Sequence, residues 1–410
     1  MHSSTPAKAG VAFCCRGKAV KTTNPNLFPI SLSQFGIAFS GYCVNVLLPF
    51  YVIKVSPYSP QETLIWTGWI VGSHHLIMAV ASNVWGFLTS RFDPKWVYIR
   101  GTLIYTVLFA LMGLTSSLPM LLLLRILQGL VGGISTIGLI IVSSSASRER
   151  VSADLGFFQT FLTLGMLVGP PIGAYIAAVV GYRVGFIVAS ALVFAVSVFC
   201  YFTVKEVPRT QDRQGSPGVG ILNLKTVSAF ALCFMAYVQL MFVPSVLPNI
   251  LDTLHTEKET ALQWAGTIIM LYTGTATLGT YVWTKLSVRV GKEKMILIIV
   301  LLASLFQAAL ALSHGMVDFV LLRMAQTGFI AAVLPLVVSM FATEMRGGTI
   351  GFLNSGRFAG SALGPIIATS VLALTNFTTL YLLLSLMTIL SLGGFHWVSG
   401  KKKDPAEHLS

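Results

Sequence analysis

The chain has 410 residues, of which 55% are hydrophobic and 10% are charged, and it carries a formal net charge of +13. An average soluble domain has about 25% charged residues, so this composition excludes a soluble globular enzyme, a disordered chain and a fibrous repeat. Unbroken apolar runs also argue against an outer-membrane barrel, whose strands alternate between apolar and polar residues. The sequence predicts an all-α membrane protein that crosses the bilayer many times.

Twelve apolar segments are long enough to cross the hydrocarbon core of a bilayer, which takes about 20 helical residues. In chain order they cover residues 28–53, 63–89, 97–116, 119–143, 153–178, 184–204, 224–247, 261–286, 294–313, 317–341, 349–373 and 378–398. The first six are expected to form one half of the protein, residues 28–204, and the last six a second half, residues 224–398. A polar linker at 205–223 and tails at 1–27 and 399–410 complete the chain.

The basic residues fall on one side of the predicted membrane. Of the 27 lysines and arginines, 21 lie in loops and tails on one side, whereas Lys54, Arg183 and Lys258 lie on the other and three lie within spans. Because cytoplasmic loops carry the excess of basic residues, both termini and the linker are expected in the cytoplasm. The protein is expected in the cell membrane, or in the inner membrane of a Gram-negative bacterium. The excess charge is topological, and no nucleic-acid partner is expected.

The two predicted halves repeat each other's motifs. Four motifs of the first half recur in the same order in the second half, at nearly the same offset. The pairs are Leu48-Pro49 with Leu247-Pro248, Arg91-Phe-Asp93-Pro-Lys95 with Arg289-Val-Gly291-Lys292, Arg125-Ile-Leu-Gln128-Gly129 with Arg323-Met-Ala-Gln326-Thr-Gly328, and Gly165-x-x-x-Gly169-Pro170 with Gly360-x-x-x-Gly364-Pro365.

Two parallel halves can move relative to each other. They can rock about a site near the membrane midplane and open it to either side in turn, which is typical of a secondary transporter. The sequence has no Walker-type phosphate loop, which argues against ATP-driven transport. No cofactor and no metal site are expected.

The repeated motifs resemble those of the major facilitator superfamily across essentially all twelve spans. The loop from Gly86 to Lys95 is similar to that family's Gly-x-x-x-Asp-Arg-x-Gly-Arg-Arg signature, although Ser90 and Asp93 depart from it. This departure implies a weaker loop contact in the outward-facing state. Arg125, Gln128 and Gly129 resemble the family's motif in span 4. The Gly165, Gly169 and Pro170 pattern resembles the span-5 motif of proton-linked exporters, which implies the drug/proton antiporter branch.

Polar residues within the predicted spans are candidates for substrate contact. An arginine inside a span costs at least about 2.5–3.5 kcal/mol on insertion scales, so it must face the protein interior or water. Arg125 is therefore either a substrate or proton-responsive group or a hydrogen-bonded staple between helices, and for its counterpart Arg323 the staple is favoured. Arg357 has no counterpart in the first half, where Leu162 stands, so it is the preferred substrate-binding charge; the alternative is a side chain that snorkels to the cytoplasmic surface. The six candidates are Asn45, Arg125, Gln159, Gln239, Asn354 and Arg357.

No acidic residue falls in the middle of a predicted span. A cavity with arginines and no carboxylate should prefer an anionic or neutral solute. His74 is the first candidate for a coupling proton because imidazole titrates near physiological pH, although a structural histidine is the commoner case. Asp318 and Asp154, at span ends, are the other candidates.

Span 5 combines closely spaced glycines with two prolines. Glycines four apart allow close helix contact, and proline bends a helix. The segment is expected to act as a compliant seal between the halves; the alternative is ordinary tight packing.

The sequence as a whole predicts a secondary active transporter, a monomer in the lipid bilayer, that couples protons to efflux of a small amphiphilic or anionic compound such as a drug, an organic acid or a carboxylate siderophore. A proton-linked importer of an organic anion or other nutrient remains open, because the fold serves both directions. From other classes, an integral membrane enzyme acting on lipid and a non-transporting receptor or scaffold also remain open.

Overall fold

The computed structural model describes residues 24–147, 150–206, 223–341 and 347–400, and side chains within these ranges except at 82–90, 152, 347–351 and 399–400. Helices are the only regular secondary structure of the described residues, which confirms the expected all-α architecture. The helices are α1 (Leu27–Val55), α2 (Pro60–Arg91), α3 (Pro94–Leu114), α4 (Leu118–Leu130), α5 (Ile134–Ser145), α6 (Val151–Val180), α7 (Tyr182–Thr203), α8 (Leu224–Met241), α9 (Val243–Thr253), α10 (Lys258–Val290), α11 (Lys292–Ala309), α12 (Met316–Ile330), α13 (Val333–Phe341), α14 (Gly347–Leu374) and α15 (Phe377–Gly400), with a short 3-10 turn at Leu310–Leu312.

These helices form twelve rods, because three rods are interrupted. The breaks separate α4 from α5, α8 from α9 and α12 from α13. Gly132 and Gly133 occupy the first break, Pro244 follows the second and Pro335 the third. Glycine weakens a helix, and proline lacks the N–H that would continue the hydrogen-bond ladder. The first and third breaks lie at matching places in the two halves.

Eleven of these rods are long and apolar enough to cross a membrane, as judged by length and composition over the described residues. The remaining rod is α10, which has 33 residues but includes many threonines and glycines and is charged at both ends. These polar residues, and not burial, set α10 apart from the other rods, because most of its side chains are exposed or half-buried.

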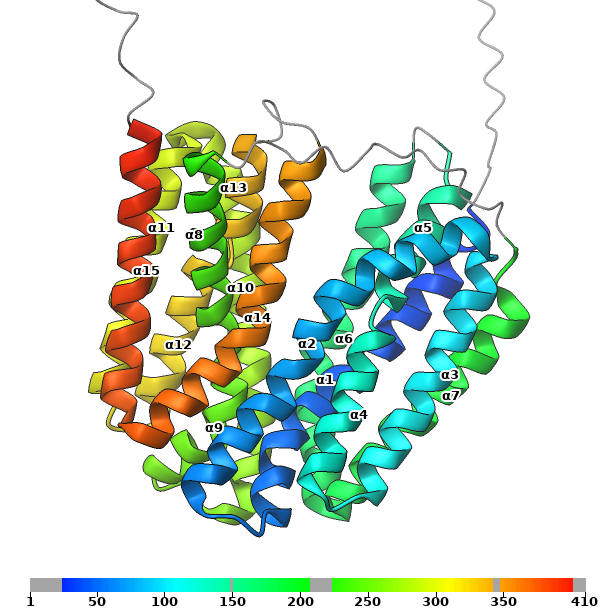
Figure 1. Cartoon of the computed structure of the whole chain (residues 1–410), viewed down its shortest axis with the longest axis horizontal. Coiled ribbons are helices and arrows are strands. Elements are labelled where there is room, and N and C mark those ends of the chain that lie inside the picture. Colours follow the sequence, from blue (N-terminus) through cyan, green and yellow to red (C-terminus); the bar gives the residue numbers. More distant parts are fainter. Residues whose placement is uncertain (1–23, 148–149, 207–222, 342–346, 401–410) are drawn as a thin grey trace, which may run out of the picture.

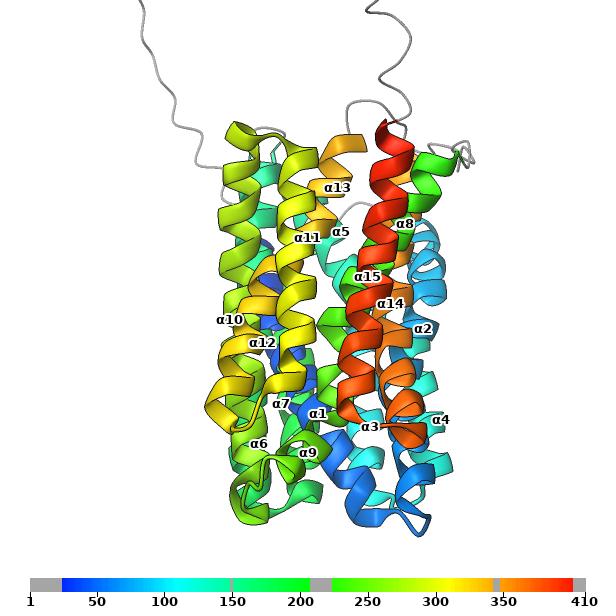
Figure 2. The same ribbon diagram turned by 90° about the vertical axis from the view of Figure 1, so that its left-hand side faces the viewer.

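The two halves stand side by side (Figure 1), and a quarter turn shows α10, α11 and α15 on the face of the second half (Figure 2). The start of α1 and the end of α15 lie at one end of the molecule, here called the terminal end; the opposite end is the far end. At the terminal end the Asn26 amide bonds Ser145 Oγ at 2.9 Å and the Lys205 carbonyl at 3.1 Å, which ties together the ends of α1, α5 and α7.

The halves meet mainly through two pairs of helices, α2 with α14 and α6 with α10, with smaller contacts of α1 and α2 with α9 and of α1 with α10. In the first pair, Gly68 lies against Thr369 and Gly72 against Ala362. In the second, a methyl group on Gly266 would come within 2.7 Å of the Pro170 carbonyl oxygen. α2 and α10 begin at the far end, whereas α6 and α14 finish there. These contacts therefore lie on the far-end side of the molecule.

The repeated glycine motifs pack inside each half. A methyl group on Gly165 would come within 2.5 Å of the Phe35 carbonyl oxygen, and one on Gly169 within 2.6 Å of that of Phe39, both on α1. Gly360 and Gly364 lie in the same way against α8. The residues of α6 that contact the other half include Leu167, Pro170, Pro171 and Ala174, on a different face of the helix. The prolines of the motif thus lie at the contact with the other half, where the seal is expected, whereas its glycines pack against α1 within the first half.

Candidate functional site

Arg125 is fully buried and links three helices of the first half. Its Nε donates to the Ile70 carbonyl at 3.0 Å and its Nη2 to the Val71 carbonyl at 3.2 Å, both on α2. Nη1 donates to Gln128 Oε1 at 2.7 Å, and Nη2 also donates to Asn45 Oδ1 of α1 at 3.1 Å. All four acceptors are neutral, so the guanidinium keeps its positive charge uncompensated by a carboxylate in this group.

Gly129 completes the span-4 motif by bringing α4 close to α2. A methyl group there would come within 2.7 Å of the His74 carbonyl oxygen. The residue thus permits the approach that lets the Arg125 side chain reach two α2 carbonyls. Here the three motif residues act as one packing and hydrogen-bonding unit.

Arg323 is also fully buried, and its guanidinium is enclosed by hydrogen-bond acceptors and aromatic rings of the second half. Nη1 donates to the Gln239 carbonyl at 2.8 Å and to Gln326 Oε1 at 2.6 Å, and Nη2 donates to the Leu240 carbonyl at 2.9 Å. The rings of Phe242 and Tyr272 both lie 4.9 Å from the guanidinium carbon.

Gln239 belongs to this closed cluster. Its Oε1 accepts from Gln326 at 2.6 Å, and its Nε2 donates to Thr388 Oγ1 at 2.7 Å. The side chain is fully buried, with both ends of its amide bonded inside the second half. The structure therefore does not bring Gln239 together with the other candidate contact residues.

Arg357 is exposed, and it lies on α14 opposite the first half. Its guanidinium carbon is 5.6 Å from the ring of Tyr237 and 5.4 Å from the ring of Phe358. Its charge also acts on Tyr42 of α1 and on His75 of α2, both in the other half. Arg357 is therefore a cation held on aromatic rings that faces across the junction of the two halves.

The exposure and helical spacing of Gln159 and Asn354 assign them to the same site. Gln159 is exposed, and its helical spacing puts it on the face of α6 that carries Leu167 and Pro170, which contact α10. Asn354 is half-buried and stands one turn before Arg357. Asn45, also half-buried, is held by Arg125. We call Tyr42, Asn45, Gln159, Tyr237, Asn354 and Arg357, with His75 and Arg125 behind them, the central site.

The sequence reasoning missed Tyr42 and Tyr237. A tyrosine within an apolar run carries no charge that would single it out. The available signal was spacing: Tyr42 stands one turn before Asn45, and Tyr237 follows Phe230 and Phe234 on the α8 face that meets Gly356 and Gly360.

The two histidines of α2 lie next to each other with ring centres 5.0 Å apart. His74 is buried and His75 is half-buried, and Nδ1 of each ring is buried with no hydrogen-bond partner among the described residues. Arg125 acts electrostatically on both rings, whereas Arg357 acts on His75. His75 is thus the histidine on which charges from both halves act.

The two acidic candidates for proton coupling lie at opposite ends of the molecule. Asp154 is buried in the first turn of α6, where its Oδ2 accepts from Asn24 Nδ2 at 2.9 Å. Asp318 is exposed in the first turn of α12 at the far end. Neither carboxylate lies in the central site.

The loops that carry the repeated basic motif differ in backbone. Asp93 caps α3 by accepting from the Lys95 N–H at 2.8 Å, whereas Gly291 ends α10 with a φ of 93°, which favours glycine. Arg91 and Arg289 are exposed at the ends of their helices. Gly86 lies in α2 within 82–90, outside the described side chains.

The family model of the Major Facilitator Superfamily matches residues 30–317 and 229–409. The chain belongs to this superfamily, as its motifs indicated, and it is a multi-pass membrane transporter rather than an enzyme.

Relatives and solved structures agree with this assignment. The multidrug resistance protein MdtG of Dickeya zeae (strain Ech586) is 24% identical over 392 residues, which cover 92% of this chain and 96% of that protein. The staphyloferrin B transporter of Staphylococcus aureus is 31% identical over 192 residues, 46% of each chain. The nucleoside transporter NupG has a TM-score of 0.72 at 14% identity and covers 93% of this chain and 100% of its own. A bacterial homologue of the lysosomal transporter Spinster, in an inward-facing and occupied conformation, has a TM-score of 0.73 at 14% identity and covers 93% and 98%.

Proposed function

We propose that the chain exports a small anionic or amphiphilic compound by alternating access, powered by the proton-motive force. The observation that carries this proposal is Arg357. It is an exposed cation in the central site, its described guanidinium contacts are the rings of Tyr237 and Phe358, and it faces Tyr42 of the other half.

A guanidinium in this setting favours an anion of planar or tetrahedral geometry. Arginine binds carboxylate and phosphonate groups through two parallel hydrogen bonds, and its planar face can stay stacked on an aromatic ring while it does so. The phenol rings beside it offer surface to an apolar part of the same solute. A lipophilic cation would meet Arg125 and Arg357 and no carboxylate among the described groups of the central site.

Energetics and relatives both support export. A membrane potential that is negative inside acts on an anion directly, at about 2.3 kcal/mol per charge for 100 mV. That energy supports roughly a fiftyfold outward gradient. Relatives of this chain are named multidrug resistance protein and staphyloferrin B transporter, names that fit removal of toxic compounds and movement of a siderophore.

The state of the structure fits loading from the terminal end. The contacts between the halves lie on the far-end side, at Gly68, Gly72 and Gly266, while Gln159 and Arg357 on the other side of those contacts are exposed. With both termini in the cytoplasm, as the distribution of basic residues predicts, this is the state that would accept a cytoplasmic solute. His74 and His75 are the proposed carriers of a coupling proton.

A second candidate is uptake of an organic anion together with a proton. The observation in its favour is that the charges of Arg125 and Arg357 both act on His75. An anion bound there would offset the repulsion that these arginines exert on an imidazolium, so proton and anion would favour each other's binding. If the anion and the proton bind together, they are carried across the membrane together. An inward proton gradient then drives uptake of the anion.

Proteoliposomes with an imposed potential and pH gradient test both candidates. With a membrane potential but no pH gradient, we expect the purified protein to move citrate or an anionic fluorescent amphiphile toward the positive compartment. The cationic dye ethidium should not be moved. Arg357→Gln should remove this flux, whereas Arg289→Gln, which changes an exposed arginine at a helix end, should leave it intact. Flux that follows the proton gradient against the potential would support uptake. Unchanged anion flux in Arg357→Gln, or transport of ethidium in place of anions, would refute the anion site; hydrolysis of lipid without flux of any tested solute would remove the transporter proposal.

A further inference from the structure

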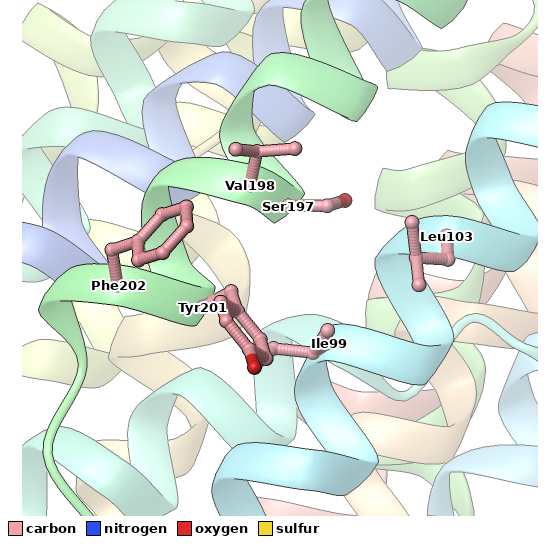
Figure 3. Close-up of a pocket in the computed structure, with 6 residues that line it drawn as sticks. All are labelled: Ile99, Leu103, Ser197, Val198, Tyr201 and Phe202. Atoms are coloured by element: carbon pink, nitrogen blue, oxygen red, sulfur yellow. The ribbon is translucent and has the colours of Figure 1, made fainter.

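The surface between α3 and α7 carries an apolar groove away from the central site. Its volume is about 320 Å³, and its walls are Ile99 and Leu103 of α3 and Ser197, Val198, Tyr201 and Phe202 of α7 (Figure 3). Both helices lie at the side of the first half that is turned away from the second half (Figure 1). The groove is thus outside the contact between the halves and faces the position of the surrounding lipid.

The groove offers no polar group to an occupant. Ser197 is the small residue that leaves room between the two helices, and its hydroxyl donates to the Val193 carbonyl of its own helix at 2.8 Å. The lining side chains Leu103, Val198 and Phe202 are 39%, 40% and 76% exposed. An apolar chain gains from such a surface, whereas a polar solute would lose its hydration without compensation.

One end of the groove is aromatic and basic. Trp96 packs edge-on against Tyr201 with ring centres 5.8 Å apart, and the Lys95 Nζ lies 6.0 Å from the Trp96 ring centre. Lys95 stands one turn before Ile99 on the same face of α3. Because α3 begins at Pro94 and α7 ends at Thr203, this end lies at the level of the membrane surface on the terminal side.

We propose that this groove binds one acyl chain of an anionic phospholipid from the leaflet at the terminal end, with the phosphate of the headgroup at Lys95. Aromatic rings at the headgroup level anchor a helix at the membrane interface, and basic residues between helices select anionic headgroups. Arg100, exposed one turn further along α3, adds to the same positive field. The groove, the rings and the lysine together match the three parts of such a lipid: chain, glycerol region and phosphate.

Trp96 is a built-in reporter for this site. Brominated acyl chains quench tryptophan on contact, and the chain has seven tryptophans, so the Trp96 signal is the difference between the wild-type protein and Trp96→Phe. In mixed vesicles, dibrominated phosphatidylglycerol should quench Trp96 at about one fifth of the mole fraction that dibrominated phosphatidylcholine requires. This factor corresponds to about 1 kcal/mol per basic residue near a headgroup.

Matched variants separate headgroup selection from chain binding. Lys95→Gln should remove the preference for phosphatidylglycerol, whereas Lys294→Gln, an exposed lysine at the terminal end of the other half, should keep it. Val198→Phe, which narrows the groove from its exposed edge, should reduce quenching by both lipids. Equal quenching by the two lipids in the wild-type protein, or a preference that survives in Lys95→Gln, would show ordinary boundary lipid only and overturn the proposal. Competition by soluble glycerol phosphate would instead show a headgroup site without a bound chain, and would overturn it as well.

Discussion

Arg125 and Arg323 occupy matching places in the two halves, yet their guanidinium groups donate to different helices. Arg125 donates to carbonyls of α2, the second rod of its half. Arg323 donates to carbonyls of α8, which is the first rod of its half. The first arginine is thereby joined to Asn45 at the edge of the central site, whereas the second is closed in by Phe242 and Tyr272. One copy of the motif lies at the edge of the central site, and the other stabilises a core.

Replacement of Arg323 should therefore reduce stability first. Arg323→Gln removes three hydrogen bonds from a buried cluster, and each such bond in a membrane protein contributes about 0.6–1.7 kcal/mol. We expect a loss of about 2–4 kcal/mol in the free energy of unfolding, measured by denaturant titration of the purified protein in detergent. Transport by the fraction that folds should keep its affinity for substrate. A normal stability with a selective loss of substrate affinity would contradict the structural role of Arg323.

Tyr237 should position Arg357 for the anion. A cation–π contact contributes about 0.5–2 kcal/mol, so Tyr237→Leu is expected to raise the KM for an anionic substrate about 2- to 30-fold. Tyr237→Phe retains the ring and should change the KM little. Initial rates of anion transport in proteoliposomes give the KM of each variant and show whether the ring or the hydroxyl of Tyr237 matters. If the phenylalanine variant loses as much as the leucine variant, the hydroxyl binds substrate and the ring contact is not the cause.

The apolar spans could be predicted from the sequence because each one leaves its own local signal. The sequence carries no such local signal for which helices pack against each other, and Gly165 and Gln239 are two examples. Glycine spacing predicts that a helix packs closely, but the choice between α1 and the other half depends on the direction in which the helix face turns. Gln239 looked like a cavity residue because it is polar within a span; only the structure shows that Gln326 and Thr388 satisfy its amide.

The central site shows the same limit. Arg357 could be predicted as a candidate because the equivalent position in the first half is occupied by the apolar residue Leu162. Tyr42 and Tyr237 have no such contrast, and their importance comes from proximity to Arg357 across a large separation in sequence. The breaks at Gly132 and Pro335 had residue signals of their own, but an apolar run that continues through them hides the interruption.

The pH dependence of anion binding separates export from the uptake alternative, in which His75 takes up a proton beside Arg357 and binding becomes tighter as pH falls. A bound anion offsets the repulsion between the imidazolium and the two arginines, so by linkage the proton strengthens anion binding in turn. If the chain takes up its anion with a proton, the dissociation constant, measured by isothermal titration calorimetry between pH 8 and pH 5.5, should fall for the wild-type protein and stay flat for His75→Gln; if it exports the anion in exchange for protons, as we propose, the constant should not fall. His74→Gln tests its neighbour in the same way, and His396→Gln, an exposed histidine on α15, is the control. Weaker binding at low pH would show competition between proton and anion, which is the behaviour of an exchanger, and would exclude the uptake alternative.

Gly266 should control how firmly the halves close at the far end. A side chain there would meet the Pro170 carbonyl oxygen and Ala174 Cβ, each 2.7 Å from the position of its first carbon. Overpacking of this kind costs about 1–3 kcal/mol, so Gly266→Leu should shift the equilibrium toward the state open at the far end by about 5- to 150-fold. Gly393→Leu places the same side chain where nothing lies within 4 Å and should have no effect.

Thiol labelling from each side of the membrane measures this shift. A cysteine at Gln159 is expected to react from the terminal side in the starting protein, and a cysteine at Ala362, buried against Gly72 of α2, is expected to be protected. With Gly266→Leu the first should react more slowly and the second should become reactive from the far side, because one rigid-body motion separates α6 from α10 and α2 from α14 together. Exposure of Ala362→Cys without any protection of Gln159→Cys would mean that the substitution only loosens the far end. In that case the two helix pairs would not act as one seal.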